Sequence, residues 1–157
     1  MKLEYFQMLD RVTDLDIGNR SIRFEAEVPQ TSPIFEGHFP GYPTMPGVLL
    51  IETMAQASGW LVAALLKFER MSYLASVKEA KMRAFIGPGE TIGISAKVVH
   101  DGSGYSVTEA TIENAGKTAC SATLMMRNMP FPNDELRGYM ESVAKRIGLP
   151  QQMGMHG

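Results

Sequence analysis

The sequence has 157 residues, of which 45% are hydrophobic, with one cysteine and a formal net charge of −2. A chain of this length buries about 70% of its unfolded surface, which is enough for one core without disulfide bonds. The slightly acidic charge argues against a nucleic-acid-binding protein, and we expect the lone Cys120 to be a small, buried hydrophobic residue. Charged residues interrupt the N-terminal segment, so no signal peptide is predicted and the cytoplasm is the expected location.

The first predicted strand covers residues 21–28, and a proline-rich loop follows it. His38 opens this loop, in which three prolines restrict the backbone because each fixes its own φ and limits the residue before it. A helix is predicted to begin at Gly47, because a proline just before it suits a first helical turn. An imidazole therefore lies just before a helix start, and the Glu52 carboxyl lies one to two turns inside that helix.

Residues 48–68 are long and apolar enough to suggest a membrane span, but Glu52, Gln56 and Ser58 interrupt them. Only about fourteen residues run without a charge, fewer than the roughly twenty that a spanning helix needs. A helix that is apolar nearly all round is buried on most sides, so we predict a core helix and no transmembrane segment. We expect its last apolar residues in the core and the charged residues after them at the surface: Trp60, Leu61, Leu65 and Leu66, then Lys67, Glu69 and Arg70.

Strand character dominates the sequence after this helix. Strands are predicted over residues 71–77, 91–100, 105–114 and 118–127, separated by glycine-rich turns. Apolar and polar residues alternate in the second of these strands, which is typical of a sheet with two unlike faces. The Asp-Gly-Ser-Gly sequence at 101–104 indicates a hairpin. One long buried helix with about five antiparallel strands predicts an α+β architecture.

Residues 129–157 are predicted to form an extension beyond a main domain of residues 1–128. A Pro-Phe-Pro segment precedes a short helix predicted from Asp134 to about Ile147. Apolar residues recur at helical spacing on one face of it: Leu136, Tyr139, Met140, Val143 and Ile147. A helix this short is marginal alone, so the apolar face is expected to pack against something. His100 and His156 are expected at the surface.

The segment from the proline-rich loop into the helix resembles the signature of the 3-hydroxyacyl-[acyl-carrier-protein] dehydratases of bacterial type II fatty-acid synthesis. That signature runs from a Gly-His-Phe-Pro loop through Met-Pro-Gly-Val-Leu to a helical Glu and a following Ala-Gln. The matching residues are Gly37, His38, Phe39, Pro40, Met45, Pro46, Gly47, Val48, Leu49, Glu52, Ala55 and Gln56. With looser matches on both sides, the resemblance covers roughly four-fifths of the chain. It implies a hotdog fold, in which an antiparallel sheet of about five to six strands wraps around a long central helix.

The resemblance implies removal of water from a 3-hydroxyacyl thioester to give the trans-2-enoyl product. His38 is the expected base, because histidine is the side chain whose ordinary pKa lies nearest neutral pH, and Glu52 is the expected acid for the leaving hydroxyl. The backbone N–H groups of Gly47 and Val48 are expected to polarise the thioester carbonyl. Gln56 lies one turn beyond Glu52 and is expected either to orient it or to make a structural hydrogen bond. No metal or organic cofactor is required.

The resemblance also implies partners. The substrate is carried by an acidic acyl carrier protein, and the His and Glu of one site come from two subunits of a homodimer, with a trimer of dimers as a larger alternative. Five basic residues near the end of the helix and in the next strand are candidates for carrier-protein docking, with a merely solvated surface as the alternative. They are Lys67, Arg70, Lys78, Lys81 and Arg83.

Two other functions remain open at this point: a hotdog thioesterase, or an acyl-carrier-protein-binding module without catalysis. A thioesterase of this fold lacks the His-to-Glu loop, and a binding module needs neither an acid nor a base. Isomerising relatives typically carry Asp at the position of Glu52, which favours dehydration alone. The short N-terminal segment and the C-terminal extension depart from the family pattern, so the acyl chain length and the type of lipid pathway stay open. The extension is expected to pack on its own sheet, on a neighbouring subunit or at the mouth of the acyl tunnel.

Overall fold

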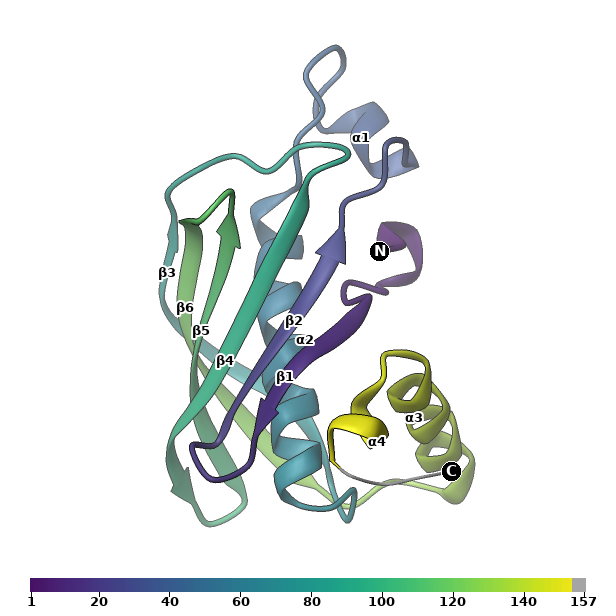
Figure 1. Cartoon of the computed structure of the whole chain (residues 1–157), viewed down its shortest axis with the longest axis vertical. Coiled ribbons are helices and arrows are strands. Elements are labelled where there is room, and N and C mark those ends of the chain that lie inside the picture. Colours follow the sequence, from purple (N-terminus) through teal and green to yellow (C-terminus); the bar gives the residue numbers. More distant parts are fainter. Residues whose placement is uncertain (154–157) are drawn as a thin grey trace.

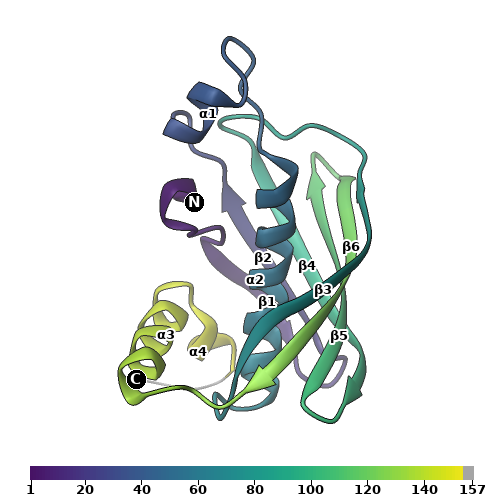
Figure 2. The same ribbon diagram turned by 180° about the vertical axis from the view of Figure 1, so that it is seen from behind.

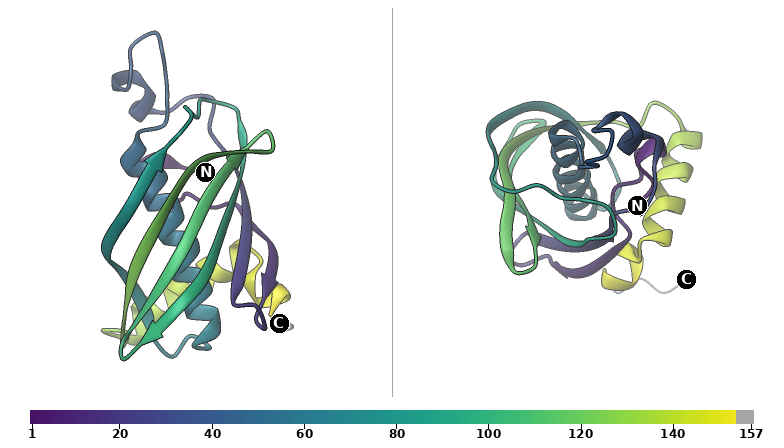
Figure 3. Two further views of the ribbon diagram at one scale, coloured as in Figure 1. Left: turned by 90° about the vertical axis from the view of Figure 1, so that its left-hand side faces the viewer. Right: turned by 90° about the horizontal axis from the view of Figure 1, so that it is seen from above.

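A computed structural model describes residues 1–153, except for the side chain of Gln151. One six-stranded antiparallel sheet curves around a long helix, α2 (Gly47–Leu65), as Figure 1 and the view from above in Figure 3 show. The strand order is β1-β2-β4-β5-β6-β3. The bounds are β1 Arg11–Asp16, β2 Ser21–Glu27, β3 Met71–Met82, β4 Thr91–Gly102, β5 Tyr105–Asn114 and β6 Lys117–Met129. The predicted α+β hotdog architecture is confirmed.

Four short elements were not predicted: the 3-10 helix η1 (Leu3–Tyr5), strand β1, helix α1 and helix α4 (Leu149–Gln152). Strand β1 has only two apolar residues, Val12 and Leu15, which are three positions apart, so its apolar side chains do not alternate regularly. Helix α1 (Pro33–Gly37) begins at Ser32, whose hydroxyl accepts a hydrogen bond from the N–H of Ile34 at 3.2 Å. A serine cap followed by proline is a sequence signal for a helix start, and it could have revealed α1.

Strand β3 extends five residues beyond the predicted end at Val77. Its pairing with β6 shifts register between Leu74 and Ser76 and again between Lys78 and Lys81. Only Met71 of this strand is buried, so the second half of β3 has no alternating apolar pattern by which the sequence could reveal it. The remaining predicted strands agree with the structure to within two residues at each end.

Helix α2 is the core helix that the sequence predicted. By length and composition it could cross a membrane, but 67% of its most apolar window is buried inside the fold, as expected of the central helix of a folded domain. Trp60 and Leu61 are buried, Leu65 and Leu66 pack against the core, and Lys67 is exposed just after the helix end.

The C-terminal extension packs on its own chain. Helix α3 (Asp134–Arg146) starts at Asn133, whose side chain accepts a hydrogen bond from the N–H of Leu136 at 2.8 Å, and the short helix α4 (Leu149–Gln152) follows. The two helices lie beside β1 and the lower half of α2 (Figure 2). Ile147 and Leu149 are buried in the main core. The apolar face of α3 therefore packs within its own subunit, which was one of the alternatives considered. His156 lies outside the described residues.

The two edges of the sheet differ. The backbone N–H of Val12 in edge strand β1 donates to the carbonyl of Ile147 at 2.9 Å, so the extension covers that edge. The other edge strand, β3, has no such cover among the described residues, and its Tyr73, Leu74 and Val77 are exposed. A long open edge with exposed apolar side chains is a template for pairing with another chain.

Candidate active site

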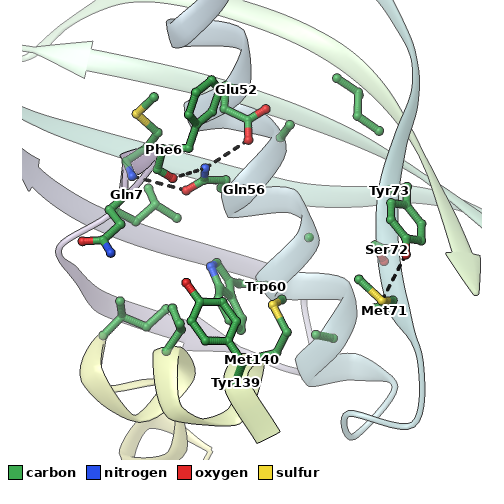
Figure 4. A pocket seen from close by; sticks show the side chains of 18 of the residues that line it. Phe6, Gln7, Glu52, Gln56, Trp60, Met71, Ser72, Tyr73, Tyr139 and Met140 are labelled. Atoms are coloured by element: carbon green, nitrogen blue, oxygen red, sulfur yellow. Dashed lines mark hydrogen bonds between the residues drawn. The ribbon is translucent and has the colours of Figure 1, made fainter. Parts of the chain in front are cut away.

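A mostly apolar pocket of about 350 Å³ lies between α2, the N-terminal segment, the start of β3 and the C-terminal extension. Figure 4 shows Glu52 at one end of it, with Gln56 and Trp60 following along the same helix. Leu74, Met126 and Val143 line it from other elements. The lining of the pocket thus suits an apolar ligand with one carboxyl group beside it.

Gln56 connects the Glu52 carboxyl to the N-terminal segment. Its Nε2 donates to Glu52 Oε1 at 3.0 Å and to the carbonyl of Phe6 at 2.7 Å. Its Oε1 accepts from the N–H of Met8 at 3.3 Å. Gln56 thus contacts the Glu52 carboxyl and also bridges α2 to the N-terminal segment, and its role in orienting Glu52 stays a prediction. Phe6 itself has φ of 54° and lines the pocket.

His38 lies at the end of α1, where the chain turns into the proline-rich loop. Its Nδ1 is 2.9 Å from the carbonyl oxygen of Thr44. A carbonyl oxygen only accepts, so Nδ1 carries the hydrogen and the Nε2 of the neutral ring keeps its lone pair. The loop is tied to the segment after β3, because the N–H of Met45 donates to the carbonyl of Ile86 at 2.7 Å.

The start of α2 presents backbone donors. The N–H groups of Leu49 and Leu50 donate to the carbonyl of Pro46, whereas those of Gly47 and Val48 have no acceptor among the described residues. The Val48 side chain is 73% exposed. These two N–H groups are consequently available to a ligand oxygen at the helix start.

The structure does not bring all of these groups to one place within a single chain. Glu52 and Gln56 line the pocket, but His38, Gly47 and Val48 are not part of its lining. Spacing along the sequence joined the imidazole and the carboxyl in one motif, but within one subunit His38 does not line the pocket that contains Glu52.

The five basic residues also separate in a single chain. Lys67 and Arg70 lie before the start of β3, while Lys81 and Arg83 lie at its other end, about 35 Å away at the rise of an extended strand. All five side chains, including Lys78, are exposed. Their proximity in the sequence therefore does not make one basic patch on one subunit.

Several pocket residues were missed by the sequence reasoning. Phe6, Tyr73 and Phe131 come from three distant segments, and nothing in their local sequence indicates a shared cavity.

Cys120 is fully buried, as expected, and burial raises the pKa of its thiol to about 11. The thiol therefore stays protonated at neutral pH and is a poor nucleophile.

Comparisons with known proteins agree with this architecture. Residues 1–123 match the family model described as FabA-like domain. A 3-hydroxyacyl-[acyl-carrier-protein] dehydratase FabZ of Levilactobacillus brevis is 38% identical over 117 residues, covering 74% of this chain and 78% of the relative. A protein of the same name from Shewanella denitrificans is 37% identical over 131 residues, covering 76% and 80%.

Solved structures with low sequence identity share the fold. A putative thioesterase from Ralstonia eutropha superposes with a TM-score of 0.61 at 14% identity, covering 74% of this chain and 82% of that one. The dehydratase heterocomplex ApeI:P from Xenorhabdus doucetiae gives a TM-score of 0.55 at 18% identity, covering 70% and 89%. These likenesses concern the fold alone, which thioesterases and dehydratases share. From the family match and the identity to the FabZ proteins, we conclude that the chain belongs to the FabA-like family and is a FabZ-like dehydratase of the hotdog fold.

Proposed function

We propose that this protein removes water from 3-hydroxyacyl thioesters on acyl carrier protein to give trans-2-enoyl thioesters, in fatty-acid or specialised lipid synthesis. The observation that carries the proposal is the His38 hydrogen bond to Thr44, which leaves Nε2 as a proton acceptor, together with the Glu52 carboxyl beside an apolar pocket.

The reaction needs one proton removed and one proton supplied. His38 Nε2 takes the proton from the carbon next to the thioester carbonyl, and the electrons of that C–H bond form the new double bond as the C–O bond at the third carbon breaks. Glu52 in its acid form donates the proton that lets the hydroxyl leave as water. The N–H groups of Gly47 and Val48 receive the negative charge that develops on the thioester oxygen. Gln56 positions the Glu52 carboxyl through its Nε2 donor.

We infer that one complete site takes His38 and Glu52 from two subunits joined along β3. The Glu52 pocket is lined by the beginning of β3, at Met71–Leu74, whereas the His38 loop is tied to Ile86 just after the end of β3. Antiparallel pairing of two β3 edges about a two-fold axis sets the beginning of one strand opposite the end of the other. Such pairing would bring the partner subunit's His38 toward this Glu52 pocket.

The same pairing bears on the carrier protein. It would bring Lys67 and Arg70 of one subunit toward the partner subunit's Lys81 and Arg83, and thus form a basic surface from two half-patches near the site. An acidic carrier protein fits such a surface by charge. The homodimer, a trimer of dimers and the location in the cytoplasm stay predictions.

Complementation between inactive variants tests the proposal. His38→Ala and Glu52→Gln should each lose on the order of a hundredfold or more in dehydration of 3-hydroxyacyl carrier protein while remaining folded. A mixed oligomer of the two variants should regain part of the activity, because one of its two sites then holds an intact His and an intact Glu. No recovery after verified subunit exchange would refute the shared site, and release of free thiol without enoyl product would favour a thioesterase.

A further inference from the structure

The C-terminal extension supplies one end of the pocket that contains Glu52. Tyr139 and Met140 of α3 lie beside Trp60, at the end away from Glu52 (Figure 4). Val143 and Ile147 of the extension also line the pocket. These residues lie beyond the family match over residues 1–123, so this end of the pocket is a property of the extension.

The extension is held in place by direct bonds as well as by burial. Arg137 Nη2 donates to the carbonyl of Phe68 at 2.6 Å, which fixes the first half of α3 to the chain segment after α2. Ala144 on the inner face of α3 is 2% exposed. A helix fixed at both ends and buried on its inner face makes a defined wall at this end of the pocket.

We propose that α3 is the floor of the acyl-binding pocket and that Met140 and Val143 set the longest acyl chain that the protein accommodates. The inference rests on the proposed dehydration, because the contact of Glu52 with the leaving hydroxyl fixes the position of the third carbon. Trp60 follows Glu52 by eight residues on α2, a rise of about 12 Å. An extended alkyl chain advances about 1.3 Å per carbon. About nine carbons therefore fit beyond the third, and the limit lies near twelve carbons in total.

Binding can be measured without catalysis, because Trp60 is the only tryptophan of the sequence and lines the pocket. The probes are N-acetylcysteamine thioesters of saturated acids from butanoyl to hexadecanoyl, which have no 3-hydroxyl group to eliminate. Their affinity, followed by Trp60 fluorescence, should rise about fourfold for each methylene that becomes buried. The rise should stop near twelve carbons, where the chain meets α3.

Substitutions on α3 should move this limit in opposite directions. Met140→Ala opens space and should extend the limit by about two carbons, whereas Val143→Phe fills space and should shorten it by a similar amount. Lys145→Ala, on the exposed side of the same helix, is the matched control and should leave the limit unchanged. Near-UV circular dichroism of each variant checks that the fold is retained.

Turnover of 3-hydroxyacyl carrier proteins by the same variants separates this inference from the proposed function. The chain-length limit for binding could move in the variants although neither they nor the wild type dehydrate any substrate. That result would refute the proposed dehydration but would still support α3 as the floor of the pocket. Dehydration with the same chain-length limit in Met140→Ala, Val143→Phe and wild type would refute the floor. A Trp60 response that is independent of chain length would also refute it.

Discussion

Replacement of Gln56 by alanine tests how the acid is held in place. Gln56 makes two hydrogen bonds of 3.0 Å or less, to Glu52 and to the carbonyl of Phe6, and a longer one of 3.3 Å from the N–H of Met8. Each of the two short bonds contributes about 1 kcal/mol, and the partly buried Met8 N–H would lose its acceptor at a further fraction of that cost. The Gln56→Ala variant should therefore lose about 2–3 kcal/mol of unfolding free energy, which lowers Tm by about 6–9 °C in a chain of this size.

The same variant should also lose catalytic rate. Without the Nε2 donor, the Glu52 carboxyl is free to rotate, so kcat for dehydration should fall about tenfold while KM changes little, because the apolar pocket is retained. Gln7→Ala is a matched control: Gln7 lines the same pocket, and its side chain has no hydrogen bond among the described residues. Thermal denaturation measures the effect on stability, and steady-state kinetics well below the measured Tm of each variant measures the effect on catalysis.

Two results would refute this reasoning. If Gln56→Ala and Gln7→Ala lost equal stability, the bridge between α2 and the N-terminal segment would contribute nothing measurable. If Gln56→Ala lost stability but kept kcat, Gln56 would be a structural residue that does not position Glu52.

Three further expectations follow from the surface and the core. The Lys81→Glu, Arg83→Glu double variant should raise KM for carrier-protein substrates and leave a small thioester substrate unaffected, whereas equal losses on both would contradict a docking role. A Val77→Lys variant places a charge in the middle of the open β3 edge, so light scattering should show a smaller particle and activity should fall; an unchanged mass would argue against pairing at this edge. Burial raises the pKa of the Cys120 thiol to about 11, so a thiol reagent at pH 8 should label native protein far more slowly than urea-unfolded protein. Labelling of the native protein should accelerate as the pH rises toward 11. Equal labelling rates in both states would show that the thiol is accessible.

Local sequence rules determined the parts of the site whose residues are neighbours along the chain. The helix that carries Glu52 and the loop that carries His38 lie within fifteen residues of each other, where proline, glycine and apolar periodicity fix the backbone. The two strands of the 91–114 hairpin were predicted for the same reason, because they alternate regularly and a glycine-rich turn joins them. Strands β1 and β3, in which buried and exposed residues do not alternate regularly, could be predicted only partly or not at all.

Only the tertiary structure decided which residues from distant parts of the sequence share the pocket. It also decided which residues that are close in the sequence lie far apart in the fold. The Gln56 hydrogen bonds reach residues 48 and 50 positions away, and Met140 reaches the same cavity from beyond the last strand. Conversely, Arg70 and Lys81 are close in the sequence but lie at opposite ends of β3, since an extended strand advances about 3.3 Å per residue. A pattern of apolar residues specifies that a face is buried, but it carries no information on what covers that face, because burial of apolar area is non-directional. The packing of α3 on its own chain, and with it the α3 residues that line the Glu52 pocket, was therefore settled by the fold.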